Sequence, residues 1–150
     1  MNEMNEDAGS GIVRVTVAGT AVFVIAAVAA LADSSLEPAA VVVDLLLFLG
    51  GVIAFLWAYV VAIQRSREVL IGIGGLYFLQ DSAPRPIQLR LLGALAAQVV
   101  GAFATAGVRP FSGLAFGVLV PVWGLGLCGL WAARYGTFPP RSDGEVRPAG

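Results

Sequence analysis

The chain has 150 residues, of which 58% are hydrophobic and only 13% charged, whereas about a quarter of the residues of a soluble domain are charged. Its formal net charge is −1, which argues against nucleic acid as a partner, because nucleic-acid binding needs a strongly basic surface. The lack of histidine excludes His-ligated haem and zinc, and the single cysteine, Cys128, excludes an internal disulfide or a CxxC redox pair.

Four long apolar runs dominate the sequence. A hydrocarbon core about 30 Å thick needs about 20 apolar residues, because a helix rises 1.5 Å per residue. The predicted spans cover residues 12–32, 38–63, 87–107 and 111–133. They predict an all-α fold, a four-helix transmembrane bundle with its transmembrane domain over residues 12–134.

The first span is preceded by an acidic segment, residues 1–11, which we expect to be a cytoplasmic tail. An A-x-A motif that ends at Ala32 resembles a signal-peptidase site. The acidic tail and the length of the apolar run argue against a signal peptide. We therefore expect the first span to be retained, with cleavage as the alternative.

The second span contains Asp44, the only acidic residue inside a predicted span. An ionised side chain at the bilayer centre costs about 2.5–3.5 kcal/mol, so an acid in a span is a candidate functional residue. Arg109, at the outer end of the third span, lies at a comparable depth. We expect a structural Asp44–Arg109 pair; a solvent-facing acid and a proton or cation site are the alternatives.

A shorter apolar segment, residues 69–79, follows the second span. Its eleven residues rise only about 17 Å as a helix and cannot cross the membrane. We expect it to lie at the cytoplasmic interface, with Tyr77 and Phe78 at headgroup depth. A re-entrant segment that lines a cavity and an extension of the second helix are the alternatives.

The third span carries Gln98 near its middle, and a glutamine in lipid usually hydrogen-bonds to another helix. Small residues also repeat along the third and fourth spans, and such residues let helix backbones approach closely. These candidate packing residues are Gly93, Ala97, Gly101 and Thr105, followed by Gly113, Gly117 and Gly124. They predict helix contacts, either inside the bundle or with a partner.

Pro121 interrupts the fourth span. It deprives the Gly117 carbonyl of its helical N–H donor and predicts a kink. Such kinks occur in transporters, but also in inert bundles that satisfy the carbonyl in another way. We favour the inert interpretation. After this span, we expect residues 135–150 to form a disordered cytoplasmic tail.

The arginines predict the orientation of the spans. Cytoplasmic loops are enriched in Lys and Arg, and most arginines here lie in the second connection and in the C-terminal region. With both termini in the cytoplasm, eight of the nine arginines are cytoplasmic and only Arg109 is outside. We therefore predict a multi-pass protein of the plasma membrane with both termini inside.

The segment Ala115–Arg141, AFGVLVPVWGLGLCGLWAARYGTFPPR, together with IGIGGLYFL at residues 71–79, resembles small four-helix integral membrane proteins of actinobacteria that are uncharacterised. The resemblance implies the four-span topology and no site residue. Small multidrug-resistance exporters have a similar size but carry a glutamate in their first helix. The first span here has no acidic residue.

No residue pattern in the sequence suggests a catalytic, metal or cofactor site, so we expect a protein that is not an enzyme and has no cofactor. Apart from the lipid bilayer, the expected partner is another membrane protein or a second copy of the chain. The leading hypothesis is an accessory or scaffolding subunit that associates through small-residue helix faces. The alternative is a small homo-oligomeric transporter or proton-coupled channel that uses Asp44.

Overall fold

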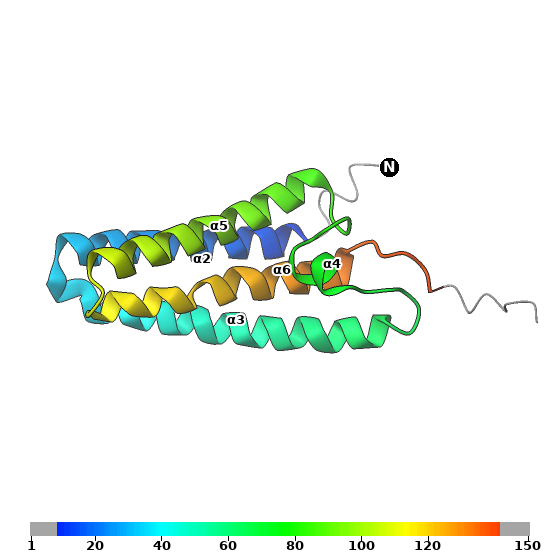
Figure 1. Ribbon diagram of the computed structural model, residues 1–150, viewed down its shortest axis with the longest axis horizontal. Helices are drawn as coiled ribbons and strands as arrows, with labels where there is room; N and C mark the ends of the chain where they lie inside the picture. The colour runs from blue at the N-terminus through cyan, green and yellow to red at the C-terminus, as the bar shows by residue number, and fades with distance from the viewer. Residues whose placement is uncertain (1–8, 142–150) are drawn as a thin grey trace, which may run out of the picture.

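The computed structural model describes residues 9–141, and this part of the chain is almost entirely helical (Figure 1). Its long helices are α2 (Ser10–Ala32), α3 (Glu37–Arg65), α5 (Arg85–Val108) and α6 (Pro121–Tyr135). Shorter pieces connect them, namely the 3₁₀ helices η1 (Ser34–Leu36) and η2 (Gly113–Leu119) and the helix α4 (Ile73–Tyr77). Within residues 9–141 the extended pairing is limited to one isolated bridge, between Val69 and Pro140.

Four helical segments are long and apolar enough to cross a membrane, which confirms the predicted all-α architecture with four candidate spans. They cover Ser10–Ala32, Ser34–Arg65, Arg85–Val108 and Gly113–Tyr135. Their outer faces are also apolar, and the side chains of Ile25, Ile53 and Phe103 are 67–70% exposed. A surface of this kind is suited to hydrocarbon rather than to water.

Successive spans run in opposite directions, so the two ends of the bundle differ (Figure 1). The start of α2, the α3–α5 connection and the end of α6 lie at one end, which we call the termini end. The connections η1 and η2 lie at the other, the η end. Of the arginines within residues 9–141, Arg109 directly follows α5 and precedes η2, and so lies at the η end. The others lie near the starts of α2 and α5, in the α3–α5 connection, or near or after the ends of α3 and α6, and so at the termini end; they are Arg14, Arg65, Arg67, Arg85, Arg90, Arg134 and Arg141.

Glycines bring α6 against α3. A Cβ added to Gly126 would collide with the carbonyl oxygen of Gly51, and one added to Gly51 would stand 2.5 Å from the backbone nitrogen of Trp123. The Trp123 indole fills the space beside Gly19 of α2 and Gly50 of α3, where a Cβ would overlap the ring. The backbones of α3 and α6 are therefore in direct contact, and one large ring from α6 occupies the space next to α2.

The fourth span is divided at Pro121, the first residue of α6. The Gly117 carbonyl, which the proline deprives of its usual donor, instead accepts the N–H of Val120 at 3.0 Å. The Val120 carbonyl likewise accepts the N–H of Trp123 at 2.8 Å. Bonds between residues three apart thus satisfy the backbone at the break, as 3₁₀ turns commonly do at helix ends.

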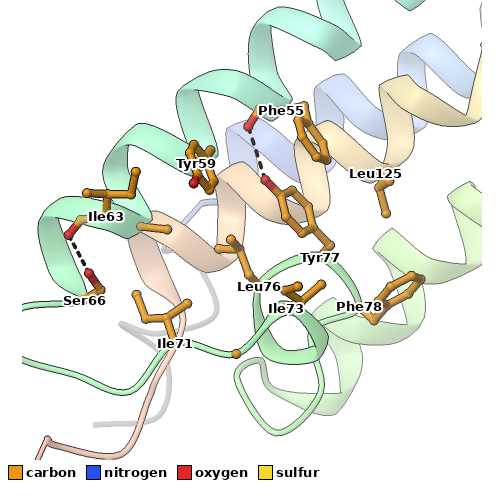
Figure 2. Close-up of a pocket in the computed structure, with 12 residues that line it drawn as sticks. Phe55, Tyr59, Ile63, Ser66, Ile71, Ile73, Leu76, Tyr77, Phe78 and Leu125 are labelled. Carbon is orange, nitrogen blue, oxygen red and sulfur yellow. Dashed lines mark hydrogen bonds between the residues drawn. The ribbon is translucent and has the colours of Figure 1, made fainter.

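The short helix α4 packs inward, and the side chain of Tyr77 is buried against the bundle rather than exposed on its surface. Its ring stacks on Phe55 of α3 with the ring centroids 4.4 Å apart, and its hydroxyl donates to the Phe55 carbonyl at 3.4 Å (Figure 2). Gly129 of α6 lies against the same ring, since a Cβ there would come within 2.5 Å of it. Phe78, by contrast, is half-exposed. An extension of the second helix is also excluded, because α3 ends at Arg65.

The C-terminal residues that follow α6 hold this connection in place. The Leu70 N–H donates to the Pro139 carbonyl, and the Arg141 N–H donates to the Glu68 carbonyl, each at 2.9 Å. The Arg65 guanidinium donates to the Ala133 carbonyl at 2.7 Å and so caps the end of α6.

The expectation of a disordered tail from residue 135 is therefore wrong for residues 135–141. Tyr135 belongs to α6, and the segment after it pairs with a part of the chain about 70 residues earlier. The rest of the predicted tail, residues 142–150, and residues 1–8 of the acidic segment lie outside the described residues.

Candidate functional site: buried polar residues in the bundle

The long helices bury several polar side chains. Each of these polar residues is at most 8% exposed, and they belong to α2, α3 and α5. They are Thr16, Thr20, Asp44, Gln98 and Thr105. Because an unpaired polar group in an apolar interior costs free energy, the partner of each side chain decides whether it is structural or a candidate for function.

Gln98 is fully buried and joins three helices. Its Nε2 donates to the Thr20 hydroxyl of α2 at 2.7 Å, and its Oε1 accepts the N–H of Gly124 of α6 at 3.1 Å. Thr20 in turn donates to the Thr16 carbonyl at 2.9 Å. The first N–H groups of a helix have no partner within the helix, and the Gln98 side chain supplies one for the start of α6.

Gly124 is required by this arrangement, since a Cβ there would stand 2.6 Å from the Gln98 Oε1. The sequence pointed to Gln98 and Gly124 separately, and the structure brings them together. It did not point to Thr16 and Thr20. Their signal was nonetheless present, because two threonines four residues apart lie on one face of a helix.

Asp44 is 3% exposed, and no hydrogen bond or ion pair joins its carboxyl group to another side chain within residues 9–141. Its surroundings are defined by Gly117 of η2. A Cβ on this glycine would lie 3.7 Å from Asp44 Oδ2, 3.5 Å from Thr105 Oγ1 and 3.4 Å from the Phe23 ring. The carboxyl group and the Thr105 hydroxyl therefore border the same small space beside Gly117.

The Thr105 hydroxyl directs its proton elsewhere. It lies 3.0 Å from both the Gly101 and the Ala102 carbonyl oxygens of its own helix and donates to them. Its oxygen keeps acceptor capacity on the side of Gly117. Thr105 therefore presents an acceptor, and no donor, to the space that Asp44 borders.

Arg109 is not the partner of Asp44, which corrects the expected pair. Its guanidinium donates to the Leu31 carbonyl at 3.2 Å and to the Ala30 carbonyl at 3.5 Å. These carbonyls belong to the last turn of α2, where helix carbonyls lack intrahelical donors and the helix dipole favours a cation. The positive charge of Arg109 is thus stabilised by the C-terminal end of α2. The low exposure of Asp44 also contradicts the solvent-facing alternative.

The small residues of the third span face in two directions. Gly101 packs on Phe23, whose ring a Cβ would approach to 3.0 Å, and Thr105 is buried. Gly93 and Ala97 are exposed, and a Cβ on Gly93 would meet no atom within 4 Å. In the fourth span, Gly113, Gly117 and Gly124 all face other helices of the bundle. Only part of the proposed packing surface is therefore free on the outside.

Reactive groups are sparse in the described range. Residues 9–141 hold no group of three or more Cys, Asp or Glu side chains that could bind a metal ion, and Cys128 is a buried free thiol in α6. Comparison with protein families, with curated proteins and with solved structures found no match to this chain. The resemblance to actinobacterial four-helix proteins therefore stays a prediction.

Proposed function

We propose that this chain is an accessory or scaffolding subunit of the plasma membrane, without catalytic activity, which binds another membrane protein or its own copies through the outer face of α5. We define this α5 outer face by its exposed small residues, Gly93, Ala96, Ala97, Ala104 and Gly107. The observation that carries the proposal is that Gly93 and Gly107 have open space beside them. A glycine inside a helix destabilises it by up to about 1 kcal/mol relative to alanine, but it lets a second helix approach closely. Two outward-facing glycines are therefore consistent with a helix partner at this face.

The matched substitutions Gly93→Leu and Gly11→Leu test this association. Both glycines are exposed on a long helix, and a Cβ on either meets no atom within 4 Å, so both variants should fold like the parent. Purification in mild detergent, followed by mass spectrometry and size analysis, measures the bound partner or the homo-oligomer. We expect Gly93→Leu to lose it and Gly11→Leu to keep it. An unchanged assembly in Gly93→Leu would contradict the proposal.

The proposed orientation places the termini end of the bundle in the cytoplasm. Its support is the concentration of arginine at that end, since cytoplasmic loops attract Lys and Arg. A reporter that is active only in the cytoplasm should be active when fused after Arg141 and inactive when inserted at Ser35. The opposite result would reverse the orientation. In the same arrangement, α4 lies on the cytoplasmic side of the bundle, with Tyr77 packed against α3 and α6.

A second candidate function is favoured by one observation, the buried carboxyl group of Asp44 without a charged partner in the described residues. In this alternative the chain is a small homo-oligomeric transporter or proton-coupled channel, and Asp44 binds the proton or cation. An ionisable residue inside a membrane is by default a functional candidate. Proteoliposomes loaded with a pH-sensitive dye provide the test. A proton flux that Asp44→Asn abolishes at unchanged thermal stability supports the channel, and its absence in the parent rejects it.

A further inference from the structure

An apolar groove of about 510 Å³ lies beside α3, between its C-terminal half and the segment that contains α4 (Figure 2). Phe55, Tyr59 and Ile63 line it from α3, and Ile73, Leu76 and Phe78 line it from the connection. Its volume lies in the range of pockets that enclose a small-molecule ligand. Tyr59, Ile63, Ile73 and Phe78 are 49–76% exposed, so the groove opens on the outer side of the bundle.

The length of the groove corresponds to one leaflet of a bilayer. Its lining on α3 runs from Phe55 to Ser66, near the end of that helix. Eleven helical residues rise about 16 Å, which is half of a hydrocarbon core about 30 Å thick. If α3 crosses a membrane, the groove starts at the interface on the termini end and stops near the bilayer centre.

Positive charge lies at the interfacial mouth of the groove. A smaller recess of about 290 Å³ shares Ser66, Ile71 and Gly72 with the groove, and Arg141 lines it. Arg141 Nη1 donates to the Ser66 carbonyl at 2.8 Å, which fixes the guanidinium at this place. Arg67, the next residue after Ser66, is exposed, and so is the acidic Glu68 beside it. Among these three residues of the described range, Arg67, Glu68 and Arg141, the charge is net positive.

We propose that the groove binds one acyl chain of an anionic phospholipid, with the lipid phosphate at Arg141 and Arg67. Guanidinium groups bind phosphate through two parallel hydrogen bonds, and cationic side chains at a membrane surface favour anionic lipids. The apolar lining favours an acyl chain as the ligand, and the arginines at the mouth of the groove favour a negatively charged headgroup. The inference requires only that the spans cross a membrane. It does not depend on association through the α5 outer face.

The residues that follow Arg141 are the alternative occupant that the chain itself could supply for the groove. Their sequence, SDGEVRPAG, holds two acidic residues and one large apolar residue, Val146. Such a segment has too little apolar surface to fill a groove lined by aromatic and branched side chains. A lipid chain from the surrounding leaflet fits this lining better.

Native mass spectrometry of the full chain in mild detergent tests the site. Phosphatidylglycerol and phosphatidylcholine with identical acyl chains are the two probes. We expect one phosphatidylglycerol to stay bound and phosphatidylcholine to be lost. Gly72→Phe should remove the bound lipid, because Gly72 lines both cavities and a Cβ there meets no atom within 4 Å. The matched control is Gly11→Phe, which also adds a ring in open space.

The charge at the mouth is tested separately. Arg141→Gln and Arg67→Gln should each weaken phosphatidylglycerol binding about fivefold. Arg134→Gln, an exposed arginine at the same end that lines neither cavity, should not. Thermal unfolding without added lipid shows that each variant is folded. Equal binding of the two lipids, unchanged binding in Gly72→Phe, or an equal loss in Arg134→Gln would each overturn the proposal.

Discussion

The side-chain oxygen of Gln98 accepts the backbone N–H of Gly124 at 3.1 Å, so that α5 caps the start of α6 in the middle of the bundle. The same amide donates to Thr20 of α2. Three spans are thus linked by one buried side chain at a point where the fourth span changes from a 3₁₀ helix to an α-helix.

The first prediction concerns this link. Gln98→Leu should lower the free energy of unfolding in detergent by about 1–3 kcal/mol, because it leaves the buried Gly124 N–H without a partner. Thr20→Val removes the hydrogen bond that Thr20 accepts from Gln98 and the one that it donates to the Thr16 carbonyl, and it should cost about 0.6–1.7 kcal/mol. Thermal and denaturant unfolding provide the measurement, and Gln64→Leu on the exposed side of α3 is the control. A stable Gln98→Leu would show that water or a rearranged backbone satisfies Gly124.

The contact between α3 and α6 predicts opposite effects for two glycine-to-alanine changes. Gly126→Ala forces a methyl group against the Gly51 carbonyl and should destabilise the protein by about 1–3 kcal/mol. Gly93→Ala adds a methyl group in open space and should stabilise it by about 0.4–1 kcal/mol, because alanine restricts the unfolded chain. Unfolding in detergent measures both. Similar effects at the two positions would contradict the packing described for α6.

Because Asp44 and Arg109 do not contact each other, we expect substitutions at the two positions to have additive effects on the free energy of unfolding. Asp44→Asn and Arg109→Gln change different surroundings, a space beside Gly117 and the carbonyl end of α2, so the double variant should show the sum of the single effects within about 0.5 kcal/mol. A double-mutant cycle on the free energy of unfolding tests this. A coupling well above that value would restore the ion pair that the sequence suggested.

At the η end, Asp33 provides a pH-dependent prediction. The backbone N–H of Ser35 donates to its carboxylate at 2.9 Å, and this hydrogen bond lowers the pKa of Asp33 below its usual value of 3.8. A carboxyl group whose pKa is lowered by folding adds stability above its unfolded pKa and loses it as the pH falls through the folded pKa. We therefore expect a small loss of stability below about pH 4 that Asp33→Asn removes. Carboxyl-carbon NMR titration measures the pKa directly, and a value above 3.8 would refute the hydrogen bond.

The four spans could be predicted from the sequence because apolar length is a local property. The span predicted at residues 38–63 corresponds to the helix Glu37–Arg65, and the span predicted at residues 111–133 corresponds to Gly113–Tyr135. The kink at Pro121 was equally local, since proline removes a donor wherever it stands. The donor to the freed carbonyl depends on the local geometry, and the structure shows that the Gly117 carbonyl accepts the N–H of Val120.

Contacts between distant segments could not be predicted in this way. Gly93 and Gly101 look alike in the sequence, yet one faces outward and the other meets Phe23, because the neighbouring helices decide which side is covered. The place of Tyr77 between α3 and α6 depends on Gly129, more than 50 residues later. The partner of Arg109 could not be predicted for the same reason. Comparing the depths of charged residues pointed to Asp44, whereas the guanidinium binds backbone carbonyls at the end of α2.

The 3₁₀ segment η2 also affects how far the fourth span extends. A 3₁₀ helix rises about 2.0 Å per residue and an α-helix 1.5 Å, so the seven residues of Gly113–Leu119 cover about 14 Å instead of about 10 Å. The span thereby gains slightly more than the length of two further α-helical residues. It has 23 residues, against 32 in the segment Ser34–Arg65 beside it. The stretched first third of the shorter segment lets it reach farther along its longer neighbour without additional apolar residues, which reduces the mismatch in length between the two helices.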